Sequence, residues 1–480
     1  MNLYINNHSF HYELENLTRV FFPNEKITVI NTQEKAFESP YIYTEKNENI
    51  LVTVCINDYN KTLDCQKSDN DGKNELFMAQ LLYKLLSDFS GISEPWGLLT
   101  GVRPIKLLRR LIESDGAEKA EKYFREQLFV SDKKIALAQK TEKIEKSIIS
   151  LSTEKSFSLY ISIPFCPTRC SYCSFVSQSV EKAKHLMQPY TELLCKELRY
   201  TAQIVNELGL RLETVYMGGG TPTAITAQQL DMILSVVNEC FDLSSCREFT
   251  VEAGRPDTIT EEKLRVILNN NADRISINPQ TLNDDVLRTI GRQHTAQQSI
   301  DAFNLAKSVG FEHINMDLIA GLPTDTVQSF KYTLDTVCDL EPKSITVHTL
   351  SMKRSSDLTG QGVRLYKDDS IRACEMIDYS NEKLTQCDYI PYYLYRQSRM
   401  TGNLENTGWS KKGSEGLYNV YVMDETHTVL ACGAGAVTKL KRYKSEQLVR
   451  IFNHKYPYEY NTRFDELMKR KDAIKEFYLK

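Results

Sequence analysis

The sequence predicts a mixed α/β protein built around an open, partial (β/α)6 barrel, with an N-terminal α+β domain and a mainly helical C-terminal region. Two observations predict this fold class. Across residues 151–350, short apolar segments alternate with segments of helical periodicity, which is typical of parallel strands joined by helices. Glycine-rich and polar motifs follow several of the apolar segments, and barrels of this kind carry their functional groups at those strand ends.

The chain is too long, at 480 residues, for one average domain, so we assign an N-terminal domain to 1–150, the barrel to 151–350 and a C-terminal region to 351–480. A composition of 41% hydrophobic and 25% charged residues predicts a folded core. The net charge of −4 gives no reason to expect nucleic-acid binding. The first residues lack the basic and apolar regions of a signal peptide, and no apolar run has membrane-spanning length, so we expect a cytoplasmic protein without a membrane span.

Residues 1–150 are expected to form an accessory α+β domain that ends in a charged helical linker. β-Branched and aromatic residues mark its strands, while leucine and methionine at helical spacing mark its first helix. A turn-rich stretch, 96–106, precedes a short apolar helix. The expected strands are 27–30, 41–44 and 50–56, and the expected helices are 74–86, 107–112 and 131–150.

The middle of the chain is expected to contain six strand–helix units, which favours a parallel sheet with function at the carboxyl ends of its strands. The expected strands are 159–163, 214–217, 248–252, 274–277, 313–319 and 344–348. The expected helices between them are 182–208, 227–240, 260–270, 295–308 and 327–339.

The C-terminal region is aromatic and has mostly helical character. It also carries a predicted hairpin, with strands over 418–423 and 429–431 around a turn at 424–428. A glycine-rich segment that includes Gly433 and Gly435 follows this hairpin, and its glycines predict a close approach of the backbone to a group that the sequence does not identify.

Three motif cysteines, Cys166, Cys170 and Cys173, form a CxxxCxxC run directly after the first strand of the barrel. Iron–sulfur clusters are held by cysteine thiolates, usually four, so three thiolates would leave one iron open to another ligand. CxxC spacing also occurs in zinc sites, but no second CxxC or HxxxH follows here. We interpret the remaining cysteines as small, mostly buried hydrophobic residues: Cys55, Cys65, Cys195, Cys240, Cys246, Cys338, Cys374, Cys387 and Cys432.

A glycine triplet, Gly218, Gly219 and Gly220, follows the second strand and precedes Thr221. Because glycines have no side chain, backbone groups here can meet a ligand directly, although the triplet alone could also form a tight turn. Polar residues stand near the ends of later strands, where each alone could be a cap or a surface residue. These residues are Glu252, Gln280, Arg292 and Asp317.

Taken together, these motifs resemble the radical S-adenosylmethionine (SAM) superfamily, clearly over 157–350 and more weakly to about 440. The resemblance implies a [4Fe–4S] cluster on the motif cysteines, with the amine and carboxylate of SAM on the fourth iron. It implies that Tyr160 belongs to the catalytic centre with the motif cysteines. The SAM contacts that it implies are Tyr160, Tyr172, Gly218, Gly219, Gly220, Thr221, Glu252, Gln280, Arg292 and Asp317.

Within the superfamily, the GGGTPT form of the glycine segment resembles the oxygen-independent coproporphyrinogen III oxidase (HemN-type) family, and the long N-terminal extension resembles its HemZ branch. This resemblance implies oxidative decarboxylation of coproporphyrinogen III to protoporphyrinogen IX, in haem biosynthesis. It also implies a tetrapyrrole substrate and an electron donor such as flavodoxin or ferredoxin. A substrate with several carboxylates favours arginine contacts, for which the candidates are Arg255, Arg292, Arg396 and Arg399.

Two departures from the oxidase pattern leave alternatives open. Ser162 stands where the oxidases usually carry a histidine, and Ser174 follows the last motif cysteine, so an extra cysteine that some members carry is absent. The same family includes haem-binding chaperones and methyltransferases that degrade haem anaerobically, and a fold does not fix a function.

Overall fold

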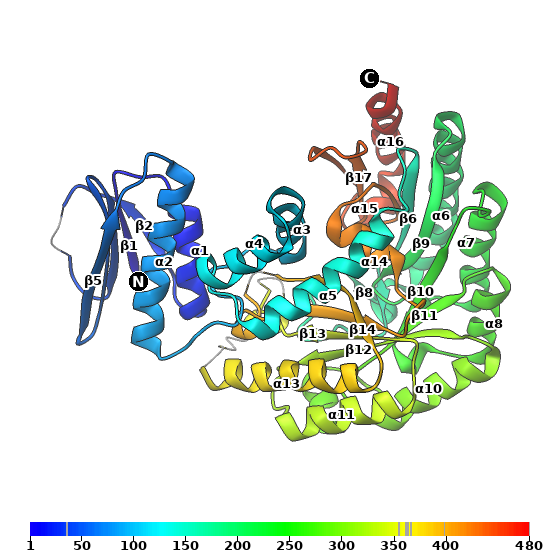
Figure 1. The fold of residues 1–480 in the computed structure, drawn as a ribbon. Coiled ribbons are helices and arrows are strands. Elements are labelled where there is room, and N and C mark those ends of the chain that lie inside the picture. Colours follow the sequence, from blue (N-terminus) through cyan, green and yellow to red (C-terminus); the bar gives the residue numbers. More distant parts are fainter. Residues whose placement is uncertain (35–36, 354–355, 361–363, 365–366, 398, 480) are drawn as a thin grey trace. The chain divides into compact units, whose positions relative to one another are not determined.

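The computed structural model describes residues 1–34, 37–353, 356–360, 364, 367–397 and 399–479 (Figure 1). The chain forms two units, each with its own core. The first unit contains Met1–Gln139, Gly362–Cys374 and Tyr395–Glu405, and the second contains Lys140–Gln361, Glu375–Leu394 and Asn406–Lys480.

The first unit is built on a five-stranded sheet with strand order β2-β1-β3-β4-β5. β1 is parallel to both of its neighbours, and the other pairs are antiparallel. The strands are β1 (Asn2–Asn6), β2 (Thr28–Asn31), β3 (Tyr41–Lys46), β4 (Asn49–Ile56) and β5 (Tyr59–Gln66). The strands expected from the sequence near 27–30, 41–44 and 50–56 are all present, whereas β1 and β5 were not expected.

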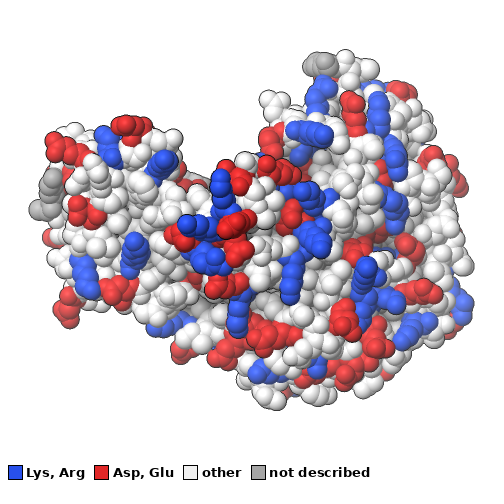
Figure 2. All heavy atoms as spheres, in the orientation of Figure 1, with Lys and Arg blue, Asp and Glu red and all other residues white. Residues whose placement is uncertain are grey.

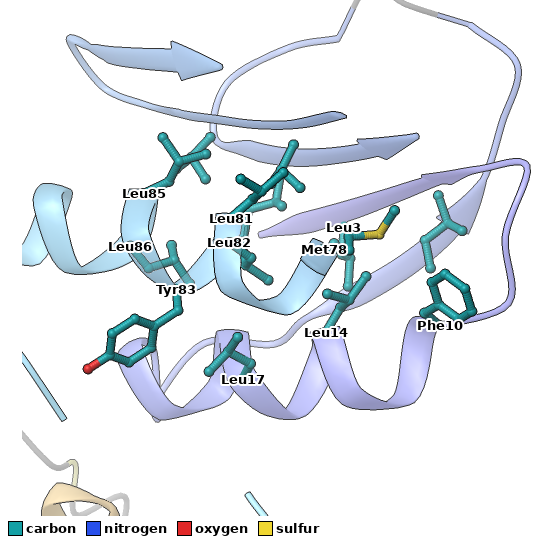
Figure 3. Close-up of a cluster of buried hydrophobic side chains, with 14 of the residues drawn as sticks. Leu3, Phe10, Leu14, Leu17, Met78, Leu81, Leu82, Tyr83, Leu85 and Leu86 are labelled. Carbon is teal, nitrogen blue, oxygen red and sulfur yellow. The ribbon is translucent and has the colours of Figure 1, made fainter. Parts of the chain in front are cut away.

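Two helices pack their apolar sides against this sheet, α1 (His11–Phe21) and α2 (Asp71–Ser90). Figure 3 shows Leu14 and Leu17 of α1 and several leucines of α2 directed toward the core, which strands β1, β3 and β4 complete. Alternate residues of β4 are buried, as a strand with one covered face requires. The sequence predicted α2 but not α1.

The first unit also contains a buried charge pair that joins segments far apart in the sequence. Lys134 Nζ lies 2.6 Å from Glu405 Oε1, and both side chains are at most 2% exposed. The Trp96 indole donates to the other carboxylate oxygen of Glu405 at 2.7 Å. Arg396 is buried beside them and donates to the carbonyl oxygen of Leu99. Arg396 is therefore a structural residue of this core, and Arg399 belongs to the same unit.

Helices complete this part of the chain, and the expected helices near 107–112 and 131–150 are present. They are α3 (Pro104–Asp115), α4 (Ala117–Lys122), a π-helical turn (Tyr123–Gln127) and α5 (Asp132–Ile149).

The second unit is built on an eleven-stranded sheet with strand order β14-β15-β13-β12-β11-β10-β9-β6-β16-β17-β18. Its six central strands are parallel and adjacent in chain order, as the sequence predicted. They are β6 (Ser156–Ile163), β9 (Arg211–Gly219), β10 (Glu248–Gly254), β11 (Arg274–Gln280), β12 (His313–Ala320) and β13 (Ser344–Thr349).

The five helices expected between these strands are also present, and Figure 1 shows them around the outer side of the sheet. Capping boxes at Thr226 and Thr295 start two of them, and left-handed glycines end two. The helices are α6 (Val180–Leu208), α7 (Ala227–Cys240), α8 (Glu261–Asn269), α10 (Ala296–Val309) and α11 (Val327–Asp339), with a further short helix, α9 (Asp284–Thr289).

The sheet is open, because strands from the C-terminal region continue it at both sides of the parallel set. β13 pairs with β15 in the antiparallel sense, and β6 pairs with β16 in the parallel sense. The C-terminal strands are β14 (Ile390–Tyr395), β15 (Asn406–Ser410), β16 (Thr428–Cys432), β17 (Val437–Lys441) and β18 (Leu448–Phe452). The helices of the C-terminal region still contain more residues than its strands, as expected, but most of these strands were not predicted, since they need distant partners that local sequence does not reveal.

The predicted hairpin over 418–431 is wrong, because its first half is a helix, α14 (Leu417–Asp424), although β16 confirms the strand expected over 429–431. The buried carboxylate of Glu248 accepts hydrogen bonds from the backbone N–H groups of Leu417 and Tyr418, at the start of this helix. A carboxylate at that place satisfies helix N–H groups that have no partner within the helix. The other C-terminal helices are α12 (Asp357–Gly360), α13 (Lys367–Gln386), α15 (Pro457–Thr462) and α16 (Phe464–Leu479).

The glycine-rich segment after β16 packs tightly against the end of β6, so the close backbone approach predicted for it is confirmed. A Cβ atom at Gly433 would lie 2.5 Å from the Ser162 carbonyl oxygen. The Ser162 hydroxyl donates to the Ala434 carbonyl at 2.8 Å. Glu197 of α6 accepts from the Gly433 N–H at 2.8 Å and lies 2.9 Å from Lys471 of α16.

Across the described part of the chain, no helix has both the length and the hydropathy needed to cross a bilayer. On the face drawn in Figure 2, lysine and arginine are interspersed with aspartate and glutamate.

Candidate active site

The motif cysteines lie on a loop that begins at the carboxyl end of β6 and that backbone hydrogen bonds hold in place. Two-residue strands, β7 (Phe165–Cys166) and β8 (Gln178–Ser179), pair and close the loop. The Ser171 N–H donates to the Ile290 carbonyl at 3.0 Å, and the Leu358 N–H donates to the Ser171 carbonyl at 3.0 Å. The loop is thus fixed by the segments that follow β11 and β13.

The thiols of this loop are largely removed from water. Burial raises the pKa of Cys166, and it raises the pKa of Cys173 to about 11. Thr221 Oγ1 lies 3.5 Å from Cys166 Sγ, and Arg255 Nη1 lies 3.9 Å from Cys170 Sγ, so each of these thiols has a donor beside it. Metal coordination deprotonates a thiol outright, and donors of this kind stabilise the thiolate.

Three cysteine sulfurs on one loop, with donors beside two of them, fit an iron–sulfur cluster held by three residues. Among the described residues, no three His, Cys, Asp or Glu side chains are grouped closely enough to hold a single metal ion.

The glycine triplet packs the end of β9 against the cysteine loop. The Gly220 N–H donates to the Ile163 carbonyl at 2.7 Å, and the Thr221 N–H donates to the Phe165 carbonyl at 2.7 Å. A Cβ atom at Gly220 would lie 2.6 Å from the Phe165 oxygen and 3.0 Å from Cys166 Sγ. A glycine at position 220 is therefore required for packing against the loop.

Glu252 and Asp317 lie near the carboxyl ends of β10 and β12, and their surroundings push their pKa values in opposite directions. Burial raises the pKa of Glu252 to about 7, and the charge of Asp317 adds to this rise, although the Tyr216 hydroxyl donates to Glu252. Burial would also raise the pKa of Asp317, but the His348 ring, 3.8 Å away, and a hydrogen bond from Asn315 outweigh burial and hold the pKa below its ordinary value. The site thus combines an ionised carboxylate with one that titrates near neutral pH.

Three tyrosine rings stack beside these acids. Tyr216 and Tyr418 lie 4.3 Å apart at an interplanar angle of 16°, and Tyr160 lies 6.4 Å from Tyr216 and 6.3 Å from Tyr418. Burial raises the pKa of all three hydroxyls, so the rings stay neutral. Neutral tyrosine faces next to carboxylates favour a cationic ligand.

Arg292, Tyr172 and Gln280 form another side of the site. Arg292 Nη2 donates to the Tyr172 hydroxyl at 3.1 Å, and its guanidinium also donates to the Asn278 carbonyl. Gln280 has a left-handed backbone with φ of 68°, which is uncommon for a residue other than glycine. Within the described residues its buried Oε1 atom has no hydrogen-bond partner, and a bound ligand could supply one.

Several residues of this site were not expected from the sequence. His348 ends the sixth predicted strand, and that position was a usable signal. Tyr418 reaches the site only because α14 is a helix that Glu248 anchors, and its own segment carries no such signal. Asp257 forms two hydrogen bonds of 2.9 Å with Arg255, which is thereby engaged within the protein.

Comparisons with known proteins agree with this geometry. Residues 160–337 match the family model described as the radical SAM superfamily. The chain is 38% identical over 387 residues to the oxygen-independent coproporphyrinogen-III oxidase-like protein HemZ of Bacillus subtilis, covering 79% of this chain and 77% of that protein. It is 30% identical over 336 residues to the heme chaperone HemW of Lactococcus lactis, covering 68% of this chain and 81% of that protein.

The fold is similar to that of coproporphyrinogen III oxidase (HemN) from Escherichia coli, a radical SAM enzyme of known structure. The TM-score is 0.51 with 21% sequence identity, and the match covers 67% of this chain and 72% of that one.

Proposed function

The chain belongs to the radical SAM superfamily and, within it, to the family of HemN-, HemZ- and HemW-type proteins, and from this premise we propose that it oxidatively decarboxylates coproporphyrinogen III to protoporphyrinogen IX. The observation that carries the proposal is the identity of 38% to a protein named as oxidase-like, extended over 79% of this chain. The family implies a [4Fe–4S] cluster and SAM as cofactors.

In this proposal the motif cysteines hold the cluster, and the residues around them hold SAM. When bound, the reduced cluster and SAM supply a 5′-deoxyadenosyl radical, which can take a hydrogen atom from an unactivated C–H bond that offers no handle for acid–base chemistry. The protein's own contribution is to position the reactants and to provide electrostatic stabilisation.

The pairing of acids and tyrosines supports SAM recognition, because SAM carries a sulfonium and an ammonium group. The ionised Asp317 can accept from the ribose hydroxyls or the amine of SAM, and Glu252 can accept from the same kinds of donor. The stacked rings of Tyr160, Tyr216 and Tyr418 offer π faces to a cation and limit the entry of water. The unpartnered Gln280 Oε1 adds a further acceptor.

The proposed reaction balances for each of two propionate groups. A propionate loses one hydrogen atom, one electron and carbon dioxide, and a vinyl group remains. The electron passes to a one-electron acceptor, while a low-potential donor such as flavodoxin or ferredoxin reduces the cluster beforehand. We place this reaction in the cytoplasm. We interpret the six parallel strands as a partial (β/α)6 barrel around the tetrapyrrole and SAM.

The test is anaerobic incubation of the reconstituted protein, its cluster reduced beforehand with dithionite, with coproporphyrinogen III, SAM and a one-electron acceptor. Formation of the divinyl product with two equivalents of carbon dioxide would support the proposal. The identity to a heme chaperone favours haem binding without turnover as the second candidate, and tight haem binding with no vinyl product would select it. A methylated linear tetrapyrrole formed from haem would instead indicate a degrading methyltransferase.

A further inference from the structure

We infer that Arg255 and Asp257 form a buried, oriented charge pair that sets the reduction potential of the cluster, with Arg255 favouring the reduced form and Asp257 opposing it. The inference rests on the proposed function, since it requires a cluster on the motif cysteines. It concerns two residues that follow β10 and that neither the motifs nor the proposed SAM contacts include.

The orientation of the pair follows from its hydrogen bonds. Arg255 Nε and Nη2 donate to the two carboxylate oxygens of Asp257, each at 2.9 Å. The remaining nitrogen, Nη1, points the other way and donates to the Thr168 hydroxyl at 3.0 Å, with Cys170 Sγ 3.9 Å away. The positive end of the pair therefore faces the cysteine loop, and the carboxylate lies behind it.

Both members of the pair keep their charge in this setting. Arg255 is 3% exposed, and arginine stays protonated in proteins. Burial would raise the pKa of Asp257, but the hydrogen bonds and charge of Arg255 outweigh burial and hold it below its ordinary value. Removing one partner would leave a buried charge uncompensated, which is strongly unfavourable.

Arg292 and His294 are titratable side chains close to the pair. Arg292 interacts with Cys170 and Tyr172 and contributes a second positive charge. His294 Nδ1 lies 3.9 Å from Asp257 Oδ1. Burial, together with the charges of Arg292 and Arg255, lowers the pKa of His294 to about 4, so it is neutral at pH 7. Asp257 is thus the one negative side chain among these four groups.

A charge beside a thiolate ligand acts directly on the redox couple. Reduction adds one negative charge to the cluster, and hydrogen bonds to the sulfurs, net charge and solvent exposure are the factors that set cluster potentials. In a site with little water, a positive charge near a ligating sulfur is weakly screened. Arg255 should therefore stabilise the reduced cluster, and Asp257 should limit that effect from its greater distance.

Two simpler roles for Arg255 predict different behaviour. A substrate-binding arginine would present its guanidinium to a ligand, whereas this one is engaged with Asp257 and Thr168. If the pair only held β10 against the cysteine loop, every substitution that disrupts the pair would have the same effect, which is loss of the cluster. A tuning pair predicts shifts of opposite sign for its two members.

The experiment is an EPR-monitored redox titration of the reconstituted cluster, without SAM or substrate. We expect Arg255→Gln to lower the reduced-to-oxidised ratio at the wild-type midpoint potential about tenfold, a shift of 59 mV for a one-electron couple. Asp257→Asn should raise that ratio, and the double variant should lie near the wild type. Arg265→Gln, in an exposed pair with Glu261 on α8, is the matched control and should leave it unchanged.

Shifts of the same sign for Arg255→Gln and Asp257→Asn, or no shift in either, would overturn the inference. Thr168→Val separates tuning from the structural tie, because it removes a hydrogen bond but no charge and should leave the midpoint near the wild type. If Arg255→Gln does not retain iron, Arg255→Lys replaces it as the test. Arg255→Lys must then keep the midpoint potential near the wild-type value, and Asp257→Asn must raise the midpoint potential. A wild-type protein that takes up no cluster would contradict the proposed function instead.

Discussion

Replacing Glu252 by glutamine should stabilise the metal-free protein by about 3 kcal/mol at pH 8 but by only about 1 kcal/mol at pH 5. Burial raises the pKa of this carboxyl from its ordinary value of 4.5 to about 7. The folded protein therefore keeps a proton that the unfolded chain releases between those two pH values. Its stability falls as pH rises through this window, because the folded state binds more protons there.

The magnitude follows from the size of the shift. A difference of about 2.5 pKa units, at about 1.36 kcal/mol per unit, disfavours the folded state by about 3 kcal/mol once pH exceeds 7. Glutamine cannot ionise, yet it keeps an oxygen that accepts the Tyr216 hydroxyl, so the variant loses the unfavourable charge and retains the hydrogen bond. A buried acid placed for a ligand thus lowers the stability of the unliganded protein.

Urea unfolding at the two pH values measures this effect. The sequence has two tryptophans, so a Trp96→Phe background leaves Trp409 of β15 as the reporter of the second unit. Asp317→Asn is the matched control. Hydrogen bonds hold the pKa of Asp317 below its ordinary value, so this variant should be less stable at pH 8. A gain for Glu252→Gln that is equal at both pH values, or a loss at pH 8, would refute the reasoning.

Alanine at any one motif cysteine should abolish the visible absorption of the reconstituted cluster. The control variant Cys55→Ala should keep that absorption. If all three motif variants retain the absorption, the assignment of the cluster to these cysteines is wrong. Gly220→Ala should lower iron content with little change in circular dichroism, since its methyl group would meet the Phe165 oxygen at 2.6 Å. Gly101→Ala, with open space around it, is the control. Glu405→Gln should destabilise the first unit by about 3–5 kcal/mol, because it removes the carboxylate charge 2.6 Å from the buried Lys134 ammonium. Asp88→Asn, in an exposed pair, should do far less in chemical denaturation.

The parallel part of the sheet could be predicted because its signals are local. Each strand of the set is an apolar run, and each following helix repeats its apolar residues at helical spacing, so neither needed knowledge of distant partners. The run of motif cysteines directly follows the first predicted strand of the barrel, so its position at a strand end could also be predicted. The strands β14 to β18 and the helix α14 depend on contacts with segments far away in the chain.

The segment over 418–423 illustrates how tertiary structure overrides local preference. Its tyrosines and valines favour a strand. Glu248 of β10, however, accepts from the N–H groups at the start of the segment. Arg274 of β11 donates to the carbonyl oxygen of Ser414, just before the segment. The strand β5 was missed for a different reason, since most of its side chains are exposed and polar. The sequence named Arg255 only as a candidate contact for substrate carboxylates, because its pairing with Asp257 depends on the tight turn over Pro256–Thr258.

The pairing of β6 with β16 has a consequence for the order in which the protein matures on the ribosome. Ser162 and Ala434, which this pairing brings into contact, lie 272 residues apart in the chain. Until the later segment leaves the exit tunnel, β6 is the edge strand of an incomplete sheet, open to pairing with another nascent chain. Iron insertion into the adjoining cysteine loop should therefore follow the synthesis of β16, and cells that stall translation before it should accumulate iron-free, aggregation-prone chains.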